Sequence, residues 1–146
     1  MEDYISKFDN SLLPLIKNIN KPNILELGVQ KGRSTLKFLK ICEEKDGYLF
    51  SVDIDDCQLV SDDKRWKFIK SRDDNFEYIK SNIPDKLNII YIDTVHEAAH
   101  VKKIFYYYYD LLETGGYIFI DDISHLPYLD KKKSSFYCEI NNRIIN

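Results

Sequence analysis

Five short apolar segments recur along the chain, and segments with helical spacing separate most of them. They span residues 23–27, 48–54, 66–71, 87–93 and 117–123. The segment 87–93 is apolar on both faces, which is typical of a central parallel strand. The alternation predicts an α/β fold with a mostly parallel sheet, and right-handed crossovers restrict it to a doubly wound, Rossmann-like topology.

The expected helices span residues 34–44, 74–83 and 98–113. Ser34 is the candidate N-cap of the first, and the pair Gly115-Gly116 is expected to end the last. We predict a single domain over residues 1–146. Residues 1–20 would form one or two short helices interrupted by Pro14, residues 23–123 the ligand-binding core, and residues 124–146 a loop and a helix.

Composition excludes several classes of protein. The net charge of -3 provides no field that would attract nucleic acid or an anionic membrane. No apolar run approaches the ~20 residues of a membrane span. The three cysteines show no metal-binding spacing, and the acidic N-terminus does not resemble a signal peptide. We therefore expect a cytoplasmic protein without nucleic-acid or membrane partners.

A glycine turn follows the first strand. Gly28 and Gly32 form a GxxxG pattern, which lacks the middle glycine of the GxGxxG dinucleotide fingerprint. Asp53 ends the second strand, where a carboxylate can accept both hydroxyls of a ribose. NAD and S-adenosylmethionine both carry that ribose, so Asp53 leaves the two cofactors open.

Acidic residues follow the other strands of the predicted sheet. They are Glu26 in strand one, Asp73 and Asp74 after strand three, Asp93 after strand four, and Asp121 and Asp122 after strand five. Because ligands of open parallel sheets bind beyond the carboxyl ends of the strands, we expect these residues to surround a site. The alternative for each is a structural role as a helix or turn cap.

Three segments together resemble the class I S-adenosylmethionine-dependent methyltransferases: "LELGVQKGRST", "SVDID" and "IYIDTVHEAAHVKKIFYYYYDLLETGGYIFIDD". They are most similar to the small O-methyltransferase branch that includes macrocin-type sugar methyltransferases and cephalosporin-hydroxylase-like proteins. The resemblance covers residues 23–123. It departs at Val95, where the branch commonly has an acid, and at Arg72, where it has a glycine.

The resemblance implies a role for each matching residue. Glu26, Gly28, Gly32 and Ser34 would surround the methionine moiety of the cofactor. Asp53 would bind the ribose hydroxyls, and Asp73 or Asp74 would lie near the adenine edge. The class I fold normally continues into two further strands, whereas about two dozen residues follow Asp122. The chain is therefore expected to be a truncated or minimal form, or to form a homo-oligomer that covers the sheet edge.

A second constellation lies at strands four and five. If these strands are adjacent, Asp93, Asp121 and Asp122 converge, and Mg²⁺ would relieve their repulsion. The resemblance points to the same metal. His96 would be a general base or a hydrogen-bond partner of the substrate. His100 is expected to be a surface residue.

The leading prediction is an S-adenosylmethionine-dependent, Mg²⁺-assisted O-methyltransferase that acts on a small hydroxylated molecule such as a sugar. Two alternatives remain. One is an NAD-dependent or nucleotide-sugar oxidoreductase on the same kind of sheet, which the missing middle glycine disfavours. The other is a non-catalytic module that binds cofactor without a metal site or turnover.

Overall fold

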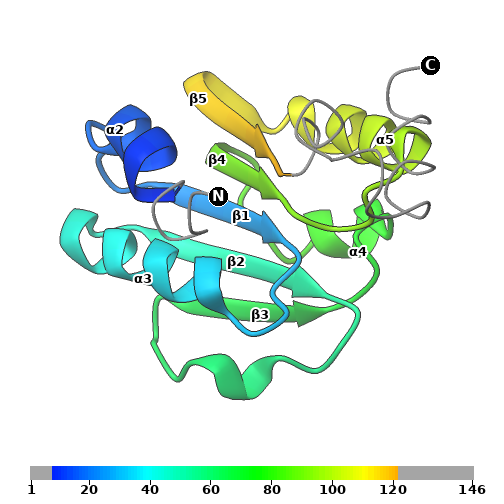
Figure 1. Cartoon of the computed structure of the whole chain (residues 1–146), viewed down its shortest axis with the longest axis horizontal. Helices are drawn as coiled ribbons and strands as arrows, with labels where there is room; N and C mark the ends of the chain where they lie inside the picture. Colours follow the sequence, from blue (N-terminus) through cyan, green and yellow to red (C-terminus); the bar gives the residue numbers. More distant parts are fainter. Residues whose placement is uncertain (1–7, 122–146) are drawn as a thin grey trace, which may run out of the picture.

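A parallel sheet of five strands forms the centre of the computed structural model, which describes residues 8–121 (Figure 1). The strand order is β3-β2-β1-β4-β5, and every neighbouring pair is parallel. The strands are β1 Asn23–Leu27, β2 Tyr48–Asp53, β3 Trp66–Lys70, β4 Leu87–Ile92 and β5 Leu112–Ile120. The predicted α/β, doubly wound fold is confirmed.

Helices cover both faces of the sheet. They are α2 Leu13–Ile16, preceded by the turn η1 Phe8–Leu12, then α3 Arg33–Lys45, the short η2 Gln58–Val60, α4 Phe76–Lys80 and α5 Ala98–Tyr109. None of the described helices is both long and apolar enough to span a membrane. Pro14 lies in the first turn of α2, where its missing N–H costs nothing, so it does not interrupt a helix there.

The core has one layer on each face of the sheet. Ile24 of β1 and Ile89 of β4 pack with Phe38 of α3 on one face. Leu25 of β1 and Ile90 of β4 pack with α4 and α5 on the other. Successive strand residues thus point to opposite faces, and both faces are buried. This explains why the β4 segment is apolar at nearly every position.

The order of the strands places a crevice between β1 and β4. The chain runs from β1 outward through β2 to β3, and then crosses back to place β4 on the other side of β1. The loops after β1 and β4 therefore leave the sheet in opposite directions. In doubly wound sheets such a switch point is where ligands bind, at the carboxyl ends of the strands.

The predicted end of the last helix is wrong. Helix α5 ends at Tyr109, and Gly115 and Gly116 lie within β5. Leu87 pairs with Leu112 while Ile89 pairs with Tyr117, so β5 contains a bulge that the two glycines help to form. Leu111 and Leu112 were expected to continue the helix. They instead begin the pairing with β4, because Leu87 N–H donates to Leu111 O.

Two other helix boundaries differ from expectation. The helix predicted over residues 74–83 is limited to Phe76–Lys80. Ser34 is not an N-cap: Gly32 occupies that position with a φ of 75°, and the Ser34 hydroxyl is used elsewhere. The prediction for residues 1–7 and 122–146 falls outside the described part of the chain.

We expect Gly116→Ala to lower the free energy of unfolding by about 1–3 kcal/mol more than Gly115→Ala does, through overpacking of the bulge. A Cβ at Gly116 would lie 2.6 Å from the Asn88 carbonyl oxygen, whereas a Cβ at Gly115 would meet nothing within 4 Å. Gly115→Ala is the matched control and carries only the cost of its positive φ, about 1 kcal/mol. Urea denaturation of both variants checks this; an equal loss in both would contradict the packing at Asn88.

Candidate active site

A cavity of about 310 Å³ opens at the carboxyl ends of the strands. Its lining comes from Gly28, Gln30, Val52, Asp53, Ile54, Asp55, Ser71, Arg72, Asp73, Asp93, Thr94, Val95 and His100. These residues end or follow β1, β2, β3 and β4, and His100 lies in the first turn of α5. The cavity therefore lies at the switch point, and its volume is within the range of small-molecule sites.

The turn after β1 lies directly against the end of β4. A Cβ at Gly28 would be 1.9 Å from the Asp93 carbonyl oxygen, and Gly28 has a φ of 102°. Hydrogen bonds from Gly28 N–H to Val52 O and from Asp93 N–H to Leu27 O hold this arrangement. Only glycine fits such a close approach, so the first glycine of the GxxxG pattern brings bare backbone to the floor of the cavity.

Asp53 binds the glycine turn through its carboxylate. Oδ2 accepts the backbone N–H groups of Val29 at 2.7 Å and Gln30 at 3.0 Å, and Oδ1 accepts Asp55 N–H at 2.9 Å. Partial burial raises the pKa of Asp53, but the hydrogen bonds from Gln30, Asp55 and Val29 outweigh it and hold the pKa below its ordinary value. Asp53 is therefore ionised at neutral pH.

Glu26 lies beneath the turn and does not line the cavity. It is 0 % exposed, and it accepts hydroxyl hydrogen bonds from Ser34 at 2.5 Å, Thr35 at 2.8 Å and Ser51 at 2.6 Å. Burial raises the pKa of Glu26 to about 7, against the lowering effect of these donors. The Ser51 hydroxyl also accepts Trp66 Nε1–H at 2.9 Å. This buried network joins β1, β2, β3 and α3.

The predicted cofactor residues thus divide into two groups. Gly28, Asp53 and Asp73 line the cavity. The residues that do not line it are Glu26, Gly32, Ser34 and Asp74. A Cβ at Gly32 would be 2.2 Å from Val60 Cγ1, so Gly32 allows η2 to pack over the turn. The sequence showed which strand ends carry acids but not which way each side chain points.

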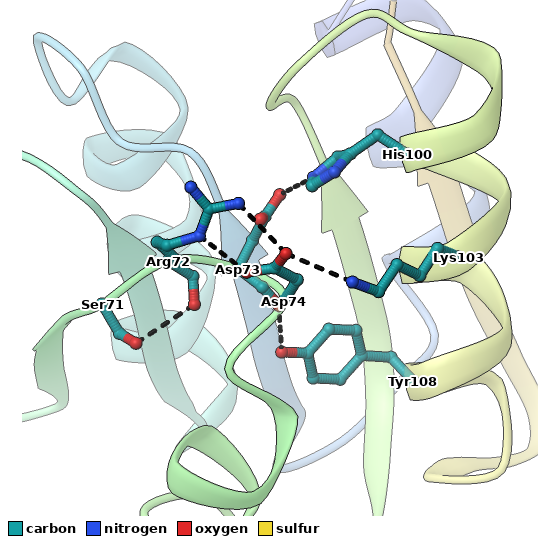
Figure 2. A network of polar contacts seen from close by, with 7 residues as sticks. All are labelled: Ser71, Arg72, Asp73, Asp74, His100, Lys103 and Tyr108. Atoms are coloured by element: carbon teal, nitrogen blue, oxygen red, sulfur yellow. Dashed lines mark hydrogen bonds and ion pairs between the residues drawn. The ribbon is translucent and has the colours of Figure 1, made fainter.

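The loop after β3 is held by a network of polar contacts (Figure 2). His100 Nε2 lies 2.8 Å from Asp73 Oδ2, and Tyr108 Oη donates to the Asp73 carbonyl at 2.7 Å. Asp74 receives two hydrogen bonds from Arg72 and one from Lys103. The Arg72 hydrogen bond is the main reason that the pKa of Asp74 lies well below its ordinary value.

His100 is therefore not a surface residue as the sequence suggested. Its side chain is 16% exposed, lines the cavity and contacts Asp73. A signal for this was present: a helix that follows a central strand has its first turn at the carboxyl edge of the sheet. Gln30, Arg72 and Thr94 also line the cavity without having been singled out as site residues.

The structure places two of the three acidic residues that were predicted to bind a metal after β4 and β5. Asp93 lines the cavity, and its Oδ1 lies 3.4 Å from His96 Nε2. Asp121 N–H donates to Ile92 O, and Tyr91 Oη lies 3.4 Å from Asp121 Oδ2. Within residues 8–121 no three His, Cys, Asp or Glu side chains form a cluster suited to a metal. Asp122 lies outside these residues, so the three-carboxylate site stays a prediction.

The charges that line the cavity favour a cationic ligand without phosphate. Four acidic residues line it, Asp53, Asp55, Asp73 and Asp93. The Arg72 guanidinium is paired with Asp74. The N–H groups of Val29 and Gln30, which in a dinucleotide site would face a phosphate, already bind Asp53. Among residues 8–121, Thr94 Oγ1 is also a buried hydroxyl without a hydrogen-bond partner.

The parallel sheet, the glycine turn at its switch point and the acid that ends β2 define a Rossmann-like domain, the fold of the class I methyltransferases. Comparison with protein families agrees: residues 25–123 match the family described as "Methyltransferase domain". This match covers more than half of the chain, and the protein belongs to this family. The predicted methyltransferase relationship is confirmed.

Two solved structures share the fold. The SAH-bound methyltransferase PaMTH1 of Podospora anserina is 17% identical, with a TM-score of 0.71 over 99% of this chain and 68% of that one. The structure of cmcI-N160 with SAH is 20% identical, with a TM-score of 0.61 over 99% of this chain and 74% of that one. A search of curated proteins gave no match.

Proposed function

We propose that this protein is an S-adenosylmethionine-dependent methyltransferase whose acceptor is a hydroxyl group of a small molecule, such as a sugar. The observation that carries the proposal is the cavity that the glycine turn and four acidic residues line. A sulfonium cofactor carries positive charge and no phosphate, so carboxylates around it cost little, whereas the pyrophosphate of NAD would face four of them. The SAH in the two similar structures supports the same cofactor.

Each side of the cavity has a distinct role in this proposal. Asp53 Oδ2 accepts the two amides of the turn, so a ribose hydroxyl would be accepted at Oδ1, beside the Asp55 N–H. Asp73, in the loop after β3, would face the adenine edge. The methionine moiety would lie over Gly28, where the backbone is bare.

Asp93 and His96 would act on the acceptor. Asp93 lines the cavity beside Gly28, and its 3.4 Å separation from His96 is a distance that can shorten when substrate binds. This pair would take the proton of the acceptor hydroxyl as the oxygen forms its bond to the methyl carbon and the bond from carbon to sulfur breaks. The products are the methyl ether and S-adenosylhomocysteine. Orientation of the two reactants would supply much of the rate.

Mg²⁺ assistance is a separate part of the proposal. Asp93 and Asp121 end neighbouring strands and offer the oxygen ligands that Mg²⁺ prefers. Asp122 or the substrate would have to complete the coordination. A hydroxyl beside a divalent cation loses its proton more easily, which would assist Asp93 and His96.

Calorimetric titration of the chain with S-adenosylhomocysteine, and separately with NAD, tests the cofactor. We expect a dissociation constant in the micromolar range for the first and no measurable binding for the second, because the N–H groups of the turn are occupied. Binding of NAD alone would favour the oxidoreductase. Assays with S-adenosylmethionine and a panel of sugars and phenols, with Mg²⁺ or with EDTA, then test turnover. Binding without turnover on any acceptor would favour a non-catalytic module.

A further inference from the structure

Helix α5 presents one face to the loop that follows β3. His100, Lys103 and Tyr108 recur at helical spacing on this face, and Figure 2 shows all three side chains directed at the Ser71–Asp74 segment. Ile104, on the same face, is fully buried. The helix is therefore packed firmly enough to place polar groups accurately against the loop.

Two of the three contacts hold the loop without entering the cavity. Tyr108 Oη binds the backbone carbonyl of Asp73 at 2.7 Å. Lys103 Nζ lies 3.3 Å from Asp74 Oδ2, and Asp74 does not line the cavity. These contacts fix the path of the loop. They leave the orientation of the Asp73 side chain to another group.

His100 makes the third contact, which differs from the other two because it joins two residues that line the cavity. Its Nε2 lies 2.8 Å from Asp73 Oδ2, both side chains line the cavity, and they are 16% and 12% exposed. A carboxylate oxygen accepts hydrogen bonds, so this contact is a hydrogen bond in the tautomer of His100 that carries its proton on Nε2. A hydrogen bond to a charged group is stronger than a neutral one, and the rigid ring loses little freedom in making it.

We propose that His100 is a positioning residue for cofactor binding: it fixes Asp73 through Oδ2, so that Oδ1 faces the cavity as a hydrogen-bond acceptor. Asp73 Oδ1 would accept a hydrogen bond from an exocyclic amine, such as the one on adenine. This inference rests on the proposed function, since it assigns the base-recognition step to that same cavity. His100 does not touch the cofactor in this arrangement but acts through Asp73.

Titration with S-adenosylhomocysteine tests the proposal in three single variants. We expect His100→Ala to weaken binding about tenfold, the size of one lost charge-assisted hydrogen bond. His100→Gln places an N–H donor close to the position of Nε2 and should bind within about threefold of the wild type. Lys103→Met, the matched control on the same helix face, removes a contact to the loop but not to Asp73, and should also stay within about threefold.

A double-mutant cycle separates positioning from general support of the fold. If His100 acts through Asp73, His100→Ala should cost little further affinity in an Asp73→Asn background. S-inosylhomocysteine, which has a carbonyl in place of the amine, should bind the wild type and His100→Ala with similar affinity. Thermal melts establish that each variant is folded.

Several results would overturn the inference. The first is that His100→Gln or Lys103→Met loses as much affinity for S-adenosylhomocysteine as His100→Ala does. The second is that the losses of affinity from the His100→Ala and Asp73→Asn changes add up in the double variant. Unchanged affinity of His100→Ala would overturn it while the proposed function stands. Failure of the wild-type protein itself to bind S-adenosylhomocysteine would refute the proposed function, and the inference with it.

Discussion

Asp53→Ala is expected to weaken the binding of S-adenosylhomocysteine by on the order of 100-fold, the equivalent of about 3 kcal/mol. The change removes the proposed acceptor of the ribose hydroxyl at Oδ1. It also releases the Val29 and Gln30 amides, which Oδ2 holds at 2.7 and 3.0 Å. Hydrogen bonds to a charged group are each worth about 1.5–3 kcal/mol, so the loss of one or two such contacts accounts for the expected size.

The same titration includes Asp53→Asn and a neighbouring control. The amide of Asn can still accept hydrogen bonds with one oxygen, so we expect an intermediate loss. Asp56→Ala removes an exposed carboxylate that lies 3.8 Å from Lys70 and does not line the cavity, and its affinity should match that of the wild type. Wild-type affinity in Asp53→Ala would show that neither the ribose nor the turn depends on Asp53.

The pKa of Asp53 adds a condition to this experiment. Because its pKa is lowered from 3.8, the native contacts of the carboxylate are fully present above that pH and are lost only as the pH falls through the lower native pKa. Between pH 5 and 8 the contribution of Asp53 to affinity should therefore be constant. A change in affinity over that range would have to come from another group.

The sequence predicted the sheet edge at which the site lies because parallel strands end on the same side. Asp53, Asp73 and Asp93 follow three different strands, and all three line one cavity. That convergence needs only the strand assignment and the doubly wound topology. The register of the strands is not required, which is why the prediction was possible from one sequence.

Side-chain direction could not be predicted in the same way. Glu26 and Asp53 both lie at the end of a strand, yet Glu26 points under α3 while Asp53 binds the turn. The difference comes from the hydroxyls of Ser34, Thr35 and Ser51, which surround Glu26 only after the helix packs on the sheet. A hydroxyl-rich helix start looks like a cap in the sequence and becomes a set of buried donors in the fold.

The boundary between α5 and β5 was missed for a related reason. Leu111 and Leu112 suit a helix and a strand equally, and glycines are common just beyond a helix. The pairing of Leu112 with Leu87 makes this segment a strand, and that pairing is a contact between residues distant in sequence. His100 was missed because its partner, Asp73, comes from a loop 27 residues away.

Glu26→Ala is expected to be the most destabilising of these changes, lowering the free energy of unfolding at pH 5 by about 3–5 kcal/mol. It leaves the hydroxyls of Ser34, Thr35 and Ser51 without their acceptor in a buried site. It also creates a cavity between β1 and α3. Guanidinium denaturation at fixed pH measures the loss, and a cost below about 1 kcal/mol would show that the hydroxyls find other partners.

Glu26→Gln isolates the charge from the packing. The amide oxygen can take the position of Oε2 and accept from Thr35 and Ser51, while the NH₂ group donates to the Ser34 hydroxyl, which can rotate. Gln is close to Glu in volume, so little packing is lost. The variant should therefore fold and should differ from the wild type mainly in its dependence on pH.

The sign of that dependence follows from the raised pKa. Glu26 has a pKa of about 7 in the folded protein against an ordinary 4.5, so between these values the native state binds the proton more tightly than the unfolded chain. The stabilisation is complete below about pH 4.5 and is lost as the pH rises through 7, up to about 3 kcal/mol. Glu26→Gln should lack this loss, so its stability relative to the wild type should rise between pH 5 and 8. Parallel curves for the two proteins would mean that Glu26 is ionised throughout, and that three hydroxyl donors suffice to hold a buried carboxylate beneath the glycine turn.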